Sequence, residues 1–230
     1  STVISIPPFP LGETSLTEHN GKLYIFGGWT GTSPSNQAHT YDIASNSWQN
    51  LPNMPVNMTQ TSAVTLGNSI YITGGTLGVT VQHFLRYDIA ANSYTTLTPP
   101  ANFTNSKLLV RGGQVLCLGG HRYGSGGYET SALFNVYDIG SDTWQSLPNM
   151  PLPRTKMAAT IWGDFLYVFG GYTVPPAYVE HLDYFVFDLL ASQWTVSTDL
   201  IPAPVSGAIT VSDTIYLASA AGSWKYYCTG

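Results

Sequence analysis

Few residues of this 230-residue chain have the type and spacing that catalysis or metal binding requires. The two cysteines, Cys117 and Cys228, have no second cysteine or histidine at a ligand spacing, so a metal site is not expected. No phosphate-binding glycine loop or Ser/His/Asp order stands out, and Gly124 to Gly127 reads as a flexible loop tip. The histidines are also dispersed: His19, His39, His83, His121 and His181. We therefore expect no metal and no cofactor.

The composition excludes two classes of partner. Charged residues make up 9% of the chain, against about 25% in an average globular protein. With 8 Lys and Arg residues and a net charge of −5, the chain has no basic surface for nucleic acid. No apolar run reaches the ~18 residues that a membrane span needs, so membrane insertion is not expected. Hydrophobic residues make up 43%, which is enough to bury a sizeable core.

Two glycosylation sequons favour an extracellular or cell-surface protein. Asn57 is followed by Met58-Thr59, and Asn102 is followed by Phe103-Thr104. Together with the low charge, these triplets predict a secreted glycoprotein with glycans on Asn57 and Asn102.

Cys117 is expected to be a small core residue with a free thiol. Cys228 lies near the chain end, where it could pair with a segment or subunit outside this chain.

The elements that would position any site come from an internal repeat. A β-rich run ends in a double glycine at Gly27-Gly28, Gly74-Gly75, Gly119-Gly120 and Gly170-Gly171, with spacings of 47, 45 and 51 residues. An aromatic-Asp pair follows at Tyr41-Asp42, Tyr87-Asp88, Tyr137-Asp138 and Phe187-Asp188. Six residues after each Asp comes an aromatic residue: Trp48, Tyr94, Trp144 and Trp194. Four antiparallel strands, a to d, repeated at this period predict the blades of a β-propeller.

A fifth, degraded copy changes how the two chain ends are interpreted. Ser219-Ala220 stands in place of the double glycine, and Tyr227-Cys228 in place of the aromatic-Asp pair. The segment Val3 to Pro10 aligns with Trp48 to Pro55, so the chain begins with a fourth strand and stops after a third. We expect the N-terminal strand to complete the last blade and close the ring. The predicted single domain, 1–230, then has blades at about 11–52, 58–98, 103–148, 154–198, and 204–230 plus 2–7.

These markers resemble the kelch motif, which is a double glycine, then Tyr-Asp, then Trp about six residues later. The resemblance covers nearly the whole chain and implies an all-β, five-bladed kelch-type propeller with four antiparallel strands per blade. Kelch propellers usually have six or seven blades. The chain is therefore either a small propeller or part of a longer one, and the near-seamless match between its two ends favours five blades.

The repeated residues are interpreted as scaffold. A glycine without a Cβ lets another backbone approach closely, and the strand-d aromatic ring can fill the space between blades. The Asp is expected to accept hydrogen bonds within the c–d turn. Function is then expected where the repeats differ, in the b–c loops and d–a links, which fall on one end of a propeller. The candidate binding residues are Trp29, His121, Arg122, Tyr123, Tyr128, Arg154, Lys156, Tyr172 and Tyr178.

Three functions remain open from the sequence. The kelch resemblance implies a non-catalytic module that binds a protein partner or assembles with itself. Exposed aromatic residues on the same loops could instead bind a glycan, as in a lectin. A carbohydrate-active enzyme, such as a kelch-type mutarotase or a glycosidase, is the third. A glycosidase of the usual kind needs two carboxylates. Glu18 is disfavoured in this role because no acid stands at the equivalent positions of the other blades, which are Thr65, Val110, Ile161 and Thr210.

Overall fold

The computed structural model of the chain describes residues 12–76, 79–100, 104–124, 127–174, 178–219 and 222–227. Across these ranges the regular structure is entirely β. Without a helix, the described ranges hold no apolar helical segment that could span a bilayer. All-β structure follows from the short alternating runs between turn residues that the repeat contains.

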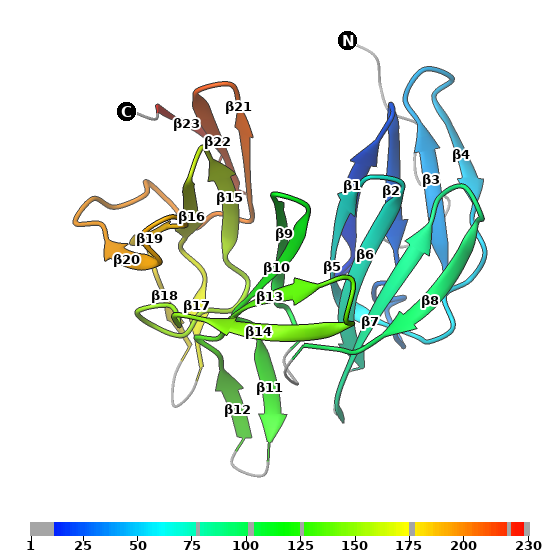
Figure 1. Ribbon diagram of the computed structural model, residues 1–230, viewed down its shortest axis with the longest axis horizontal. Helices are drawn as coiled ribbons and strands as arrows, with labels where there is room; N and C mark the ends of the chain where they lie inside the picture. The colour runs from blue at the N-terminus through cyan, green and yellow to red at the C-terminus, as the bar shows by residue number, and fades with distance from the viewer. Residues whose placement is uncertain are drawn as a thin grey trace.

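Within the described residues, five antiparallel sheets of three or four strands form what we call blades 1 to 5 (Figure 1). Blade 1 contains β1 (Ser15–His19), β2 (Lys22–Phe26), β3 (Ala38–Asp42) and β4 (Ser47–Asn50). Blade 2 contains β5 (Thr59–Leu66), β6 (Ser69–Thr76), β7 (Val79–Asp88) and β8 (Ser93–Leu97). Blade 3 contains β9 (Lys107–Arg111), β10 (Gln114–Leu118), β13 (Phe134–Asp138) and β14 (Thr143–Leu147).

Blade 4 contains β15 (Ala158–Trp162), β16 (Phe165–Phe169), β19 (Tyr184–Asp188) and β20 (Gln193–Val196). Blade 5 contains β21 (Gly207–Val211), β22 (Thr214–Ser219) and β23 (Gly222–Tyr227). The fold is thus a five-bladed β-propeller of antiparallel sheets, with four strands each in blades 1 to 4. The predicted closing strand, residues 2–7, lies outside the described residues, as do Cys228, Asn102 and the ends at Ser1 and Gly230.

Two small hairpins add to this frame. β11 (His121–Gly124) pairs with β12 (Gly127–Thr130), and β17 (Tyr172–Thr173) pairs with β18 (Val179–Glu180). Both are inserted between strands b and c, where the sequence was interpreted as variable loop. The β11–β12 hairpin projects beyond the blades at the lower edge of Figure 1. Gly124 and Gly127, which bound the predicted loop tip, form the last described pair of this hairpin, and Ser125 and Gly126 lie outside the described residues.

The hydrophobic core lies between neighbouring blades. One buried cluster joins blades 3 and 4, with Phe134 and Phe187 in edge-to-face contact at a centroid distance of 5.1 Å. Other clusters join blades 1 and 2, blades 2 and 3, and blades 4 and 5. The predicted role of the strand-d ring is confirmed, because Trp144 Nε1 donates to Thr98 O and Trp194 Nε1 to Pro148 O, each on the preceding blade. Each sheet is therefore stabilised mainly by its neighbours.

The double glycines sit where backbones meet, as predicted. A Cβ on Gly28 would lie 2.6 Å from the carbonyl oxygen of Gly12, and one on Gly171 would lie 2.7 Å from that of Thr155. Both glycines also have positive φ, which other residues rarely adopt. Blade 2 differs, because Gly74 and Gly75 continue strand β6 and let β6 and β7 run on as one long hairpin.

The propeller has two ends. We call the end with the b–c loops and d–a links the loop face, and the end with the a–b and c–d turns the turn face. On the turn face, Asp42, Asp88 and Asp138 each accept a hydrogen bond from the backbone N–H three residues later, at 2.8–2.9 Å. Asp188 accepts two such bonds, from Leu190 and Ala191. This confirms the predicted role of the repeated Asp.

Candidate interaction face

The loop face of blades 3 and 4 is one connected surface. His121 Nδ1 lies 2.9 Å from Thr155 Oγ1, which joins the β11 strand to the d–a link that enters blade 4. Thr130 Oγ1 donates to Val174 O at 2.7 Å and accepts from Val174 N at 2.8 Å, which joins the β12 strand to the loop after β17. The two inserted hairpins are thereby held in a fixed relation to each other.

Exposed aromatic side chains lie on both hairpins. Tyr178 is 67% exposed and Tyr128 is 45% exposed, and Val179 beside Tyr178 is 47% exposed. Tyr172 is half-buried, and its ring lies 5.8 Å from that of Tyr178. Its hydroxyl donates to Glu180 Oε1 at 2.6 Å, and this bond raises the pKa of Tyr172. The predicted residues Tyr128, Tyr172 and Tyr178 therefore lie on one face, held by local contacts.

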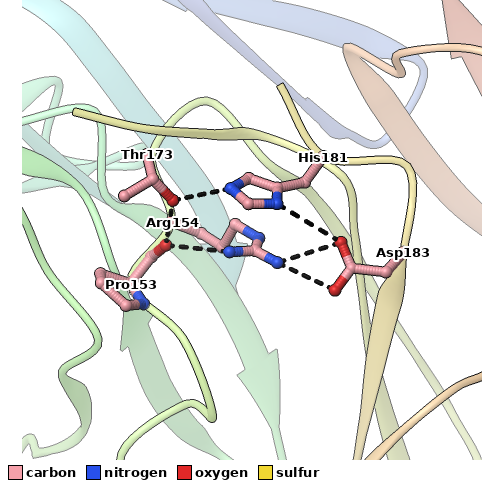
Figure 2. A network of polar contacts seen from close by, with 5 residues as sticks. All are labelled: Pro153, Arg154, Thr173, His181 and Asp183. Atoms are coloured by element: carbon pink, nitrogen blue, oxygen red, sulfur yellow. Dashed lines mark hydrogen bonds and ion pairs between the residues drawn. The ribbon is translucent and has the colours of Figure 1, made fainter. Parts of the chain in front are cut away.

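Arg154 is buried, which corrects the prediction that it contacts a ligand from solvent. Its side chain is 1% exposed, and Nη2 donates to both carboxylate oxygens of Asp183 at 2.9 and 3.0 Å. The guanidinium also lies 4.7 Å from the centroid of the Phe185 ring. Burial lowers the pKa of Arg154, and Asp183 opposes that shift. Arg154 instead connects the d–a link to the start of strand β19 (Figure 2).

The same network fixes the ring of His181 (Figure 2). Thr173 Oγ1 donates to Pro153 O at 3.0 Å, and the same oxygen lies 2.8 Å from His181 Nε2. A hydroxyl has one hydrogen, so Nε2 is the donor in the second contact. The other ring nitrogen, Nδ1, lies 3.7 Å from Asp183 Oδ1. Burial and then Arg154 lower the pKa of His181, while Asp183 raises it.

His121 is also buried, which corrects its predicted role as a surface contact. Its exposed fraction is 7%, and its ring meets that of Tyr128 edge to face at 5.5 Å. Burial lowers the pKa of His121, Lys156 lowers it further, and Glu13 raises it. The buried ring therefore supports the β11–β12 hairpin from within.

The other predicted residues are spread over the loop face. Arg122 pairs with Glu129 across the β11–β12 hairpin at 2.6 Å, and both side chains are exposed. Lys156 is exposed. Trp29 belongs to blade 1, where its backbone N–H donates to Gly12 O at 2.6 Å and its side chain is half-buried. Tyr123 lies in strand β11, opposite Tyr128.

A ring of left-handed residues surrounds the centre of this face. Glu13, Gln60, Asn105 and Lys156 each stand 14 residues before the first glycine of their blade, and all four have φ between 51° and 54°. They turn each d–a link into the innermost strand of its blade. Just inside them is a central cavity of about 370 Å³, lined by residues from all five blades. Its walls include Ser15, Ser62, Asn105, Lys107, Lys156 and Ser206.

The residues considered for a glycosidase, a metal site, a reactive thiol or a glycan have the following structural environments. Glu18 Oε1 accepts a hydrogen bond from Gly21 N at 2.7 Å, so it caps the a–b turn of blade 1. Among the described residues, no group of three or more His, Cys, Asp and Glu gathers in a metal-binding arrangement. Cys117 is a buried free thiol, and burial raises its pKa to about 12, as expected of a small core residue. Asn57 is exposed in the link between blades 1 and 2, and its glycosylation stays a prediction.

Sequence reasoning missed Asn105, Lys107 and Asp183. The repeat contained a signal for the first two. Aligning the blades places Asn105 with Lys156, and Lys107 with Ser15, Ser62 and Ala158. No comparable signal existed for Asp183, because its partner Arg154 is 29 residues away along the chain.

The fold and its repeated contacts define a β-propeller made of kelch-type repeats. The model of the Attractin/LZTR1 β-propeller family matches residues 8–208, and the chain belongs to that family. The predicted kelch relationship is thereby confirmed.

Curated relatives are also kelch proteins. Kelch-like protein terF of Aspergillus terreus is 24% identical over 93% of this chain and 50% of its own length. Kelch-like protein 25 of Xenopus tropicalis is 29% identical over 56% of this chain and 22% of its own length. Human kelch-like protein 23 is 24% identical over 78% of this chain and 31% of its own length. The chain thus spans half or less of the length of these relatives.

Proposed function

We propose that this propeller is a non-catalytic protein-interaction module, and that the loop face of blades 3 and 4 contacts the partner. One observation carries the proposal: two rigidly linked hairpins present exposed aromatic side chains at the end of the molecule where the blades differ. Tyrosine rings give large contact area at low entropic cost and are enriched at protein interfaces. The kelch relatives support the class of function.

The partner chemistry follows from the hairpin surface. Tyr128, Tyr178 and Val179 offer apolar area, while Arg122 and Glu129 satisfy each other beside it. A partner is therefore expected to bury apolar side chains against the two rings, with polar contacts at the edge. An extracellular setting and glycans on Asn57 and Asn102 remain part of the proposal, supported by the sequons and the low charge.

The test compares variants of the two ends. Tyr128→Ala combined with Tyr178→Ala removes the aromatic rings of the loop face. Ile43→Ala combined with Leu190→Ala removes exposed apolar side chains, 51% and 73% exposed, from the turn face as a matched control. Partners captured by the wild-type protein are purified and their affinities measured by calorimetry.

The loop-face variant should bind at least about 10-fold more weakly, which corresponds to about 1.4 kcal/mol, while the control binds as the wild type does. A partner that loses affinity only with the turn-face variant would place the interface at the other end. Turnover of a carbohydrate by the purified chain would overturn the non-catalytic assignment.

A further inference from the structure

The positive charges of the chain are distributed unevenly. Four of its eight Lys and Arg side chains form ion pairs with a carboxylate: Lys22 with Asp42, Arg111 with Asp164, Arg122 with Glu129, and Arg154 with Asp183. Lys225 lies over the Tyr216 ring, and Arg86 donates to Thr95. The remaining two, Lys107 and Lys156, form none of the described ion pairs, and both line the central cavity.

Lys107 is half-buried at a position where the other blades carry small residues. Ser15, Ser62 and Ala158 take its place in blades 1, 2 and 4. Burial lowers the pKa of Lys107, which means that the folded protein disfavours its charge. A cation without a counter-charge weakens folding at this position, so the fold itself gives no reason for it.

Two further polar atoms, in residues that line the cavity, are buried without a partner among the described residues. Asn105 Nδ2 and Ser15 Oγ are both shut off from solvent, and neither has a hydrogen-bond partner within the described part of the chain. Neighbouring hydroxyls are satisfied, since Thr14 and Thr61 donate to Phe26 O, and Ser206 donates to Ala218 O. Asn105 also has a left-handed backbone, with φ of 52°, as do Glu13, Gln60 and Lys156 at the equivalent positions.

Among the described residues, no acidic side chain lines the cavity to balance Lys107 and Lys156. Glu13 occupies the position of Asn105 in blade 1, but its Oε2 atom accepts a hydrogen bond from Thr59 Oγ1 at 2.8 Å, and it does not line the cavity. The cavity of about 370 Å³ is large enough for a small organic acid or an acidic side chain.

We propose that the central cavity binds a carboxylate group through the ammonium groups of Lys107 and Lys156. The carboxylate belongs either to a free organic acid or to an acidic side chain that a partner inserts from the loop face. The inference goes beyond the proposed function, because a free dicarboxylate would bind even if the hairpins bound no protein. Charge-assisted hydrogen bonds to a carboxylate would pair both cations, one from blade 3 and one from blade 4, at once.

The experiment measures binding of two acidic probes by calorimetry at low salt. Glutarate represents a free acid and a hexaglutamate peptide represents acidic side chains, with glutaramide and hexaglutamine as neutral controls. We expect one or both acidic probes to bind, no binding of the neutral probes, and weaker binding as salt increases. Binding of glutarate identifies a free acid as sufficient, and binding of the peptide alone identifies the side chain of a partner.

Variants locate the site. Lys107→Met and Lys156→Met should each weaken binding at least about 10-fold, and Asn105→Asp should abolish it by placing a carboxylate in the cavity. Lys22 lies on the turn face, so Lys22→Met should leave the affinity for the acidic probes unchanged. Lys107→Met should also melt at the same temperature as the wild type or above it, because a half-buried charge without an ion-pair partner is removed.

Three results would overturn the proposal. In the first, neither acidic probe binds. In the second, the lysine variants bind the probes as tightly as the wild type does. In the third, Lys107→Met is much less stable than the wild type, which would make Lys107 a structural residue. The cavity proposal and the proposed function can fail independently, because Tyr128→Ala combined with Tyr178→Ala should leave glutarate binding intact.

Discussion

The turn face repeats one set of contacts from blade to blade, whereas the loop face has a different structure in each blade. On the turn face, Tyr41, Tyr87 and Tyr137 donate to the side chains of Asn46, Asn92 and Asp142 at 2.5–2.6 Å. In blade 4 the donor and the acceptor are both replaced: Phe187, which has no hydroxyl, stands at the tyrosine position, and Ser192 stands at the acceptor position. On the loop face, blades 3 and 4 carry separate inserted hairpins, whereas in blade 1 Trp29 and Pro34 form a single β-bridge and in blade 2 strands β6 and β7 themselves extend.

This difference separates scaffold from candidate function. A contact that recurs in every blade stabilises the repeat and cannot by itself create one site. A contact made once, such as that of Arg154 with Asp183, shapes a single surface. On the loop face of blades 3 and 4, contacts of this kind include Arg154 with Asp183, His121 with Thr155, and Thr130 with Val174.

Gly119→Ala should have the largest effect on stability. A Cβ at this position would overlap the carbonyl oxygen of Arg154 at a φ of 56°, so the d–a link would have to move away. We expect a loss of at least about 3 kcal/mol in the free energy of unfolding, measured by urea denaturation. Gly207→Ala is the control and should stay within about 0.5 kcal/mol, because nothing lies within 4 Å of its added Cβ. Equal losses in both variants would contradict the role of the close approach.

Asp183→Ala should come next. It leaves the buried Arg154 guanidinium without its carboxylate, and we expect a loss of about 3 kcal/mol. The matched variant Glu129→Ala breaks the exposed pair with Arg122 and should cost at most about 1 kcal/mol. Replacing Arg154 and Asp183 together by leucine should cost less than Asp183→Ala alone. If the exposed pair proved the more stabilising of the two, the loop-face network would not be the rigid base described above.

The turn face can be tested by restoring the missing pair of blade 4. Phe187→Tyr alone should destabilise by about 1–2 kcal/mol, because its hydroxyl would be buried without a partner. Adding Ser192→Asn should recover about 1 kcal/mol of that loss by supplying the acceptor. Thermal and urea unfolding of the two single variants and the double variant give the coupling. No coupling would mean that the turn does not repeat its geometry in blade 4.

The smallest effect is expected from acid. The pKa of His121 is lowered in the folded protein, so the unfolded chain takes up the proton first as pH falls. Stability should therefore decrease as pH drops below the ordinary histidine value of about 6.5, and the loss should be complete below the folded pKa. His121→Asn should flatten the dependence of the unfolding free energy on pH, measured by urea unfolding at a series of pH values. His19→Asn, on the turn face, is the control and should keep the dependence of the wild type. A slope unaffected by His121→Asn would assign the acid sensitivity to other groups.

Much of the fold was predictable because the information is local and repeated. The double glycines, the aromatic-Asp pairs and the strand-d aromatics identified the blades, and their expected roles in close approach, turn capping and packing between blades are confirmed. The site was less predictable. His121 and Arg154 are polar residues in loop-like sequence, which favoured exposure, yet each is buried by a partner distant in the chain.

The sequence by itself determined the number and composition of the blades, because each strand is specified by residues within one repeat of about 45–50. Only the tertiary structure decided which loop residues are available to a ligand. That outcome depends on contacts between blades, such as the contact of His121 with Thr155 and the position of Lys107 on a cavity lined by residues from all five blades. Burial and the pairing of charges are properties of neighbours in space, and a repeat motif does not encode them.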